Sequence, residues 1–457
     1  MDRGTVSPSA RYFDGGLAMN ELHDIVLSVL DGHGVEDGVS ILSSSQEAMF
    51  RFSRNQMTVA NSLDEKSLTV FIRHDGGGSS ITIADVRPQA VKKAVETMVK
   101  RLSSRHASRQ RLPSGPFRYD DKLLRGKPVQ IEGDELVDTV QKAVHAAQEA
   151  GALRVSGTLR TENNHVSLCS TRGVEAEAVL PTAELSLRAF CDSRSSGHGL
   201  SVSGSLSGIK AEEAGQEAGM LAAASRNPVD CDPGKYQALL SPMVAADIAS
   251  QVGSMASAFY VDVGMSFLAD SIGKQVCSPV ITMEDDPTLY GTLGARPFDD
   301  EGSPTRKNTI IENGVLCRHL HNYVTATSAD VPNTANAGLV SPHPFNLVIS
   351  PGEQDKDRLL AEMDRGIYVT NIWYLRYQNY RNGDFSAIPR DAMFLVEDGA
   401  ITGPVRDLRI SDNVLGILSR LSGLSQERRW IKWWEVDTPT LSPFMLSDEV
   451  NFTRSTM

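Results

Sequence analysis

Apolar residues near the start of the chain recur at helical spacing. Within residues 19–34, Leu22, Val26 and Leu30 fall on one helical face, and glycines follow at the end of the stretch. This spacing predicts an amphipathic helix that ends at the glycines. Residues 87–104 have the same periodicity and a proline near their start, where the first turn of a helix tolerates it. Both stretches are therefore expected to be helices.

Between these two helices, apolar and polar residues alternate. The segments are "GVSILSS" (38–44), "EAMFRFSRNQMTVANS" (47–62) and "SLTVFIRHDGGGSSITIADV" (67–86). Alternation predicts strands, and the Asp-Gly-Gly-Gly stretch at 75–78 predicts a tight hairpin turn. The sequence thus predicts an N-terminal helix and antiparallel-sheet unit over residues 19–105, preceded by an N-terminal extension, residues 1–18.

The pattern of helix, strands and helix then repeats after a polar linker at 104–116. Residues 133–151 have helical periodicity, the following forty residues alternate, and residues 211–228 form an Ala-rich helical stretch. A central domain is expected over residues 116–228.

The remainder of the chain, about residues 233–445, contains one helical stretch at 243–258 among many short apolar runs. Asn-Gly at 313–314 and Asp-Gly at 398–399 predict hairpin turns. The predicted fold class is α+β. Two helix and antiparallel-sheet units precede a mostly antiparallel β C-terminal domain.

Composition narrows the classes of function. The chain has 457 residues and a formal net charge of −12. This charge argues against a nucleic-acid backbone or an anionic membrane surface as the main partner. Five widely spaced cysteines without a C-x-x-C motif fit a reducing compartment. With no apolar signal segment and no long apolar run, the expected location is the cytoplasm.

Six carboxylates lie within residues 283–308, together with Arg296. Converging carboxylates bind divalent cations. However, the spacing matches no calcium loop, and Asp also satisfies backbone N–H groups in turns. A structural loop or a substrate-cleft lining is the favoured interpretation. The candidate residues are Asp285, Asp286, Arg296, Asp299, Asp300 and Glu301.

The segment "SFLADSIGKQVCSPVITMEDDPTLYGTLGARPFDDEGSPTRKNTIIENGVL" (266–316) resembles the core signature of the TldD/PmbA family, also labelled modulators of DNA gyrase. Further similar motifs are "NTANAG" (333–338), "PFNLVISPGE" (344–353), "GIYVTNI" (366–372), "NGDFS" (382–386) and "LVEDGAITGPVRDLRISDN" (395–413). The resemblance implies a metallopeptidase-type protein and covers most of residues 235–420.

In that family the active, TldD-like subunit binds zinc through a His-Glu-x-x-x-His helix and a cysteine near the C-terminus. The corresponding segment here is "SPMVAADIASQVGSM" (241–255), which places Ser250, Gln251 and Met255 at the three motif positions. A hydroxyl and a thioether are poor zinc ligands, and a carboxamide cannot act as a base at neutral pH. The C-terminal tail also lacks a cysteine.

The resemblance therefore implies a TldE/PmbA-type, non-catalytic subunit. No cofactor is expected in this chain, and zinc is expected in a TldD-like partner, in a heterodimer or a larger assembly. The expected substrate is an extended peptide or unfolded protein. A homodimer, or a homo-oligomeric peptide-binding scaffold, is also open.

An independent metallopeptidase is the alternative. In "LCRHLHN" (316–322), a strand would point Cys317, His319 and His321 to one face. A thiolate and two imidazoles are good zinc ligands. Residues two apart on a straight strand are nevertheless rather distant to share one ion, so surface or packing roles are favoured.

Three tryptophans gather near the C-terminus, at Trp430, Trp433 and Trp434. Trp is enriched in protein–protein interfaces. A cap on the β domain and a subunit contact both remain open.

Overall fold

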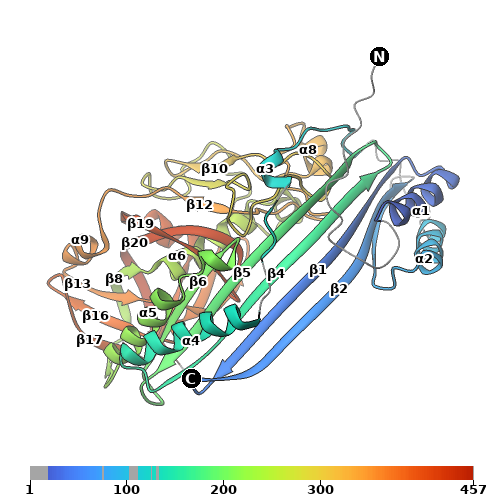
Figure 1. Cartoon of the computed structure of the whole chain (residues 1–457). Coiled ribbons are helices and arrows are strands. Elements are labelled where there is room, and N and C mark those ends of the chain that lie inside the picture. The colour runs from blue at the N-terminus through green and yellow to red at the C-terminus, as the bar shows by residue number, and fades with distance from the viewer. Residues whose placement is uncertain (1–18, 75–76, 102–111, 125, 130–132, 456–457) are drawn as a thin grey trace.

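The computed structural model of the chain describes residues 19–74, 77–101, 112–124, 126–129 and 133–455 (Figure 1). The predicted extension, residues 1–18, and most of the predicted linker lie outside the described residues. None of the helices in the described part of the chain is long and apolar enough to cross a bilayer.

The N-terminal half forms one antiparallel sheet with the strand order β3-β2-β1-β4-β5-β6. Its strands are β1 (Asp37–Ser53), β2 (Gln56–His74), β3 (Gly77–Ile83), β4 (Arg154–Ser170), β5 (Glu175–Phe190) and β6 (Ser196–Ser203). The helices of this half are α1 (Met19–Gly32), α2 (Pro88–Arg101), α3 (Asp121–Leu124), α4 (Gly133–Glu149) and α5 (Ala211–Ala224), and a 3₁₀ turn, η1, spans Leu206–Gly208. The predicted helices and the β2–β3 hairpin are confirmed.

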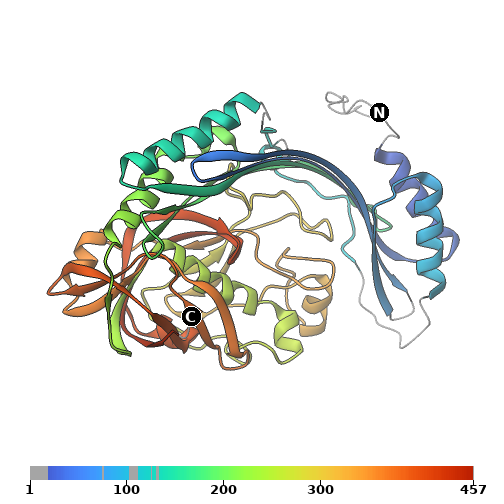
Figure 2. The ribbon, with the colours of Figure 1, turned by 90° about the horizontal axis from the view of Figure 1, so that it is seen from below.

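Long strands join the two predicted N-terminal units. Strand β1 pairs with β4 from Val39 opposite Ser170 to Phe52 opposite Gly157, so both units contribute to one continuous sheet. The division into separate domains stays a prediction. Figure 2 shows the sheet as a curved layer, with α1 and α2 over one end and α4 and α5 over the other end of the same face.

Apolar side chains explain why the helices lie on that face. Leu42, Leu68 and Val70 pack with α1 and α2, whereas Leu159 and Leu185 pack with α4 and α5. Each fully buried Leu or Val stabilises the fold by roughly 1.5–3 kcal/mol. The opposite face of the sheet turns toward the C-terminal domain (Figure 2).

The C-terminal domain is built on a mixed sheet whose pairs are mostly antiparallel; β7–β17, β8–β13 and β12–β20 pair in parallel. Its strands are β7 (Val229–Asp230), β8 (Gly234–Leu240), β9 (Met283–Asp285), β10 (Asn308–Glu312), β11 (Val315–Leu316), β12 (Leu347–Ile349), β13 (Arg365–Val369), β14 (Trp373–Asn379), β15 (Asp384–Ile388), β16 (Met393–Glu397), β17 (Ala400–Arg406), β18 (Leu408–Asn413), β19 (Leu421–Trp433) and β20 (Val436–Arg454). Its helices are α6 (Pro242–Met255), α7 (Ala258–Asp262), α8 (Tyr323–Ala329), α9 (Lys356–Ala361) and α10 (Val414–Ser419). The α+β class and the hairpins β10–β11 and β16–β17 are confirmed.

Helix α6 lies at the centre of this domain, and almost all of its residues are buried. Ser241 caps its start by accepting a hydrogen bond from the Val244 N–H, and Pro242 occupies the first turn, where it needs no donor. The close packing of α6 depends on Gly253, since a Cβ there would come within 2.6 Å of the Leu347 side chain.

A buried polar network connects the sheet to the C-terminal domain. Asp391 accepts hydrogen bonds from Arg188 on β5, from Ser196 on β6 and from the Asn371 amide. Burial, and the neighbouring Arg188 guanidinium, lower the pKa of the fully buried His198 to about 4, although Asp391 opposes the shift. His198 is therefore neutral at physiological pH, and the network is held by the ionised Asp391.

Candidate functional site

The acidic stretch predicted as a loop or cleft lining forms well-bonded loops. Asp285 is fully buried at the end of β9, where it accepts hydrogen bonds from the backbone N–H groups of Phe345 and Asn346 and from the Asn336 amide. Asp286 accepts hydrogen bonds from the backbone and hydroxyl of Thr288. These carboxylates are used to hold chain segments together.

Carboxylates in the second half of the stretch also accept hydrogen bonds from backbone N–H groups. Asp299 accepts from the backbone N–H groups of Ser303 and Ala337, and Glu301 accepts from the N–H of Tyr323 at the start of α8. Arg296 donates to Asp300 over 2.9 Å. The substrate-cleft role of these residues stays a prediction.

Burial raises the pKa of three of these carboxyl groups. It raises the pKa of Asp285 to about 6, that of Asp299 to about 7 and that of Glu301 to about 8, and in Glu301 the nearby Asp299 adds to the effect. A carboxyl whose pKa is higher in the folded state stabilises the fold below its unfolded pKa. This contribution is lost as the pH rises through the folded pKa.

We therefore expect Glu301→Gln to raise the melting temperature at pH 8 by about 2–5 °C relative to the wild type. The amide mimics the protonated acid and can still accept from Tyr323. The advantage should shrink toward zero at pH 5, where Glu301 is already protonated. Scanning calorimetry at pH 8 and at pH 5 measures the two melting temperatures, and Glu312→Gln, at an exposed position, is the control. An equal shift at both pH values would contradict the buried-carboxyl account.

The positions of the family's zinc motif lie on α6. Ser250 and Met255 are buried, Met255 within the domain core, and Gln251 is partly exposed. A hydroxyl, an amide and a thioether do not form a zinc site. Within the described residues, no group of three or more His, Cys, Asp or Glu side chains is arranged to hold a metal ion. The residues present at this place do not fit the metal.

The alternative ligand set is not assembled either. Strand β11 ends at Leu316, so the predicted strand through Cys317, His319 and His321 does not form; this expectation was wrong. The His319 ring hydrogen-bonds the Leu268 carbonyl, and the His321 ring contacts the Thr325 hydroxyl. Burial lowers the pKa of both histidines. Their contacts are those of packed loop residues.

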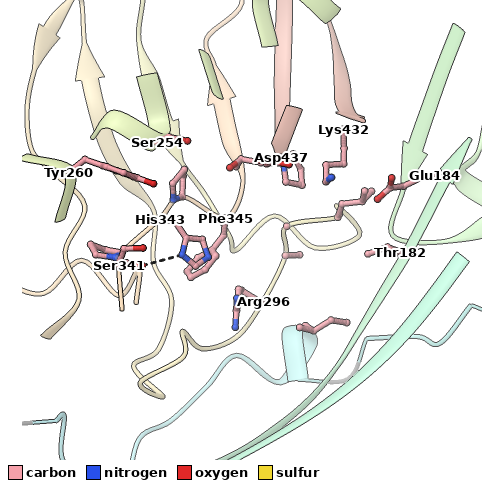
Figure 3. Close-up of a pocket in the computed structure, with 18 residues that line it drawn as sticks. Thr182, Glu184, Ser254, Tyr260, Arg296, Ser341, His343, Phe345, Lys432 and Asp437 are labelled. Carbon is pink, nitrogen blue, oxygen red and sulfur yellow. Dashed lines mark hydrogen bonds between the residues drawn. The ribbon is translucent and has the colours of Figure 1, made fainter. Parts of the chain in front are cut away.

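A pocket of about 490 Å³ lies between β5 and the C-terminal domain. Figure 3 shows Glu184 on β5 opposite Lys432 and Asp437 at the β19–β20 hairpin, with Arg296 farther along the wall. Ser254 on α6 lines the same pocket, one turn after Ser250. The pocket therefore adjoins the helix on which the family's motif positions fall.

The charged groups of this pocket are available to a ligand. Within the described residues, the side chains of Glu184, Lys432 and Asp437 form no hydrogen bond or ion pair (Figure 3). By contrast, Arg296 is fixed by Asp300 and its guanidinium lies 4.4 Å from the centre of the Phe345 ring. A polar ligand could satisfy the unpaired groups without breaking internal bonds.

Of the residues singled out from sequence, Arg296 alone lines this pocket. Glu184, Ser254, Lys432 and Asp437 were missed, because they come from distant parts of the chain and no motif links them. The nearest signal in the sequence was the group of tryptophans, because Lys432 and Asp437 lie next to it in the chain.

The Trp cluster contains one buried and one exposed side chain at the β19–β20 hairpin. Trp433 is buried against His198 and Trp373, with ring centres 4.8 Å and 4.9 Å apart, so it caps the contact between sheet and domain. Trp434, at the tip of the same hairpin, is 67% exposed. The subunit-contact interpretation stays a prediction.

Solved structures with the same fold are known. The fold is that of solved structures described as modulators of DNA gyrase. One from Thermotoga maritima superposes with a TM-score of 0.85 at 23% identity, over 95% of this chain and 100% of that chain. TldE from Thermococcus kodakarensis superposes with a TM-score of 0.81 at 22% identity, over 94% of this chain and 100% of that chain.

Comparisons of the sequence give matches to metallopeptidases. Residues 233–454 match the family described as "PmbA/TldA metallopeptidase C-terminal domain". The metalloprotease PmbA of Escherichia coli O157:H7 is 25% identical, over 86% of this chain and 88% of the relative. A metalloprotease of Methanocaldococcus jannaschii is 31% identical over 43% of this chain, a match that spans only 45% of that relative. The C-terminal domain of this chain is therefore similar to that of PmbA/TldA metallopeptidases.

Proposed function

We propose that this chain is a TldE/PmbA-type subunit of a metallopeptidase complex. It would form part of the substrate chamber, while a TldD-like chain supplies zinc and the general base. The observation that supports this most is the content of α6, where Ser250, Gln251 and Met255 stand in place of ligands and base. The pocket next to α6 would hold an extended peptide or a segment of unfolded protein.

The cytoplasm is the location that we propose for the complex. The cysteines in the structure are all free, and two of them, Cys169 and Cys317, are partly exposed. Free thiols are typical of a reducing compartment. The proposed assembly is a heterodimer or a larger complex, and nucleic acid is not part of it.

The proposal is tested by variants of the motif positions in the reconstituted complex. Ser250→Ala and Gln251→Ala are expected to change the peptide hydrolysis rate by less than about threefold, because neither group touches a metal or a proton in transfer. The matched control is alanine at the glutamate of the partner's His-Glu-x-x-x-His motif, which should lower the rate by about 10²–10⁴-fold.

A large loss from Gln251→Ala with unchanged folding would show that this chain takes part in the chemistry. Activity of the complex without any TldD-like chain would favour the homo-oligomeric alternative.

A further inference from the structure

One face of β5 lines the pocket beside α6. Leu180, Thr182 and Glu184 alternate along this strand, so their side chains share the face that is turned toward the C-terminal domain. Arg160 lies directly opposite Glu184 on β4, but its guanidinium donates to two other glutamates over 2.8 Å and 3.2 Å. Among the described residues, Glu184 therefore has no ion pair of its own.

The β19–β20 hairpin brings a lysine and an aspartate to the opposite side of the pocket. Lys432 and Asp437 lie on either side of the Trp433–Val436 pair that closes the hairpin. Although their charges are opposite, these two side chains form no ion pair with each other or with any other described residue (Figure 3). Lys432 is partly exposed and Asp437 is exposed, so both can reach a ligand.

Arg296 is a second cation of the pocket, and its position is fixed. Its Nε donates to the Phe298 carbonyl over 2.8 Å, and its Nη2 donates to Asp300 over 2.9 Å. The guanidinium also lies over the ring of Phe345, 4.4 Å from the ring centre. In the described part of the chain Nη1 makes no hydrogen bond, so it can donate to a ligand while the other contacts stay intact. A guanidinium held in this way loses little freedom when it binds a carboxylate.

The charges that line the pocket balance. Glu184 and Asp437 are two carboxylates, and Lys432 and Arg296 are two cations. His343 adds no charge at neutral pH, because burial lowers the pKa of its ring. A ligand with one sign of charge would be attracted by half of these groups and repelled by the other half. A zwitterion can place an opposite charge against both kinds.

The size and the remaining lining of the pocket suit a short peptide. Its volume of about 490 Å³ lies in the range of about 300–1,000 Å³ that is usual for small-molecule sites. A compact cavity of this volume is about 8 Å across, which is the length of about two or three extended residues. Pro344 and Phe345 supply apolar surface, and the hydroxyls of Ser254 and Tyr260 supply hydrogen-bonding groups (Figure 3).

We propose that this pocket binds di- and tripeptides whose amino and carboxyl termini are both free. Glu184 and Asp437 bind the terminal ammonium group, and Lys432 and Arg296 bind the terminal carboxylate. The inference rests on the proposed function and names a ligand class for its chamber, the short fragments that peptide hydrolysis releases. The interior of a long peptide carries neither terminal charge, so these four side chains distinguish fragments from uncleaved substrate.

Four forms of one tripeptide test the proposal: Ala-Ala-Ala, its N-acetyl form, its C-terminal amide and the form blocked at both ends. Binding to the full chain is measured by isothermal titration calorimetry at pH 6.5, where the α-amino group is protonated. The free tripeptide is expected to bind about tenfold more tightly than either singly blocked form, because hydrogen bonds between charged groups are the stronger ones. The doubly blocked form should bind least.

Variants assign the two ends of the ligand. Glu184→Gln should weaken binding of the free tripeptide about five- to tenfold and leave the N-acetyl form unchanged. Lys432→Gln should weaken the free tripeptide by a similar factor and leave the amide form unchanged. Glu212→Gln on α5 and Lys93→Gln on α2, both at exposed positions away from the pocket, are the matched controls and should have no effect. Circular dichroism verifies that each variant is folded.

The outcomes separate this inference from the proposed function. Equal affinity for the four peptides, absence of binding to all of them, or equal losses in the control variants would overturn the binding of free termini. The proposed function is judged independently, by peptide hydrolysis in the reconstituted complex. A complex that hydrolyses long peptides while the lone chain ignores tripeptides would overturn this inference alone.

Discussion

Replacing Asp285 by Ala is expected to lower the free energy of unfolding by about 3–5 kcal/mol. The carboxylate is completely buried and accepts hydrogen bonds from the Phe345 and Asn346 backbone and from the Asn336 side chain. Its removal leaves two backbone N–H groups without acceptors in a region that water does not reach, and each such loss is costly.

Urea unfolding followed by fluorescence measures this effect. Asp300→Ala is the matched control from the same acidic stretch, since Asp300 is partly exposed and forms one ion pair with Arg296. Its expected cost is below about 1 kcal/mol. If both variants lost equal stability, the acidic stretch would not be organised by its buried carboxylates.

The sequence predicted the elements that have a strong local signal. The helices now seen as α1, α2, α4, α5 and α6 follow from periodicity, and the β10–β11 and β16–β17 hairpins follow from their Asn-Gly and Asp-Gly pairs. Each of these signals arises within a few neighbouring residues, so no knowledge of distant contacts was required.

Strand limits in the N-terminal half were less predictable. Segments 38–44 and 47–62 suggested a break after Ser44, but β1 runs unbroken through it. The actual turn is at Arg54 and Asn55, whose φ values of 52° and 67° allow the tight hairpin. Polar residues at 43–47 looked like a turn because that part of the sheet has no helix over it.

The pocket could not be predicted because it is made by tertiary contact. Glu184 and Lys432 face each other across the pocket in Figure 3 although they are far apart in the chain. Nor does local sequence show that β1 and β4 join two apparent units into one sheet. Long-range strand pairing depends on burial of the whole face, which no short motif encodes.

The isolated chain is expected not to hydrolyse peptides. This is the largest functional effect that we expect. A metal-activated water needs ligands and a base, and α6 offers Ser250, Gln251 and Met255 instead. Adding a TldD-like partner should raise the rate of peptide hydrolysis by about 10²–10⁴-fold. Hydrolysis by the lone chain that a chelator abolishes would contradict this expectation.

The most direct measurement is the zinc content of the purified chain. The chain is dialysed against zinc, freed of loosely bound ion, and analysed by mass spectrometry for metal, alone and with its partner. We expect a zinc-to-chain ratio near zero for the lone chain and about one zinc per TldD-like subunit in the complex. A ratio near one in the lone chain, lost on His319→Ala, would instead mean that this chain is an independent metalloenzyme.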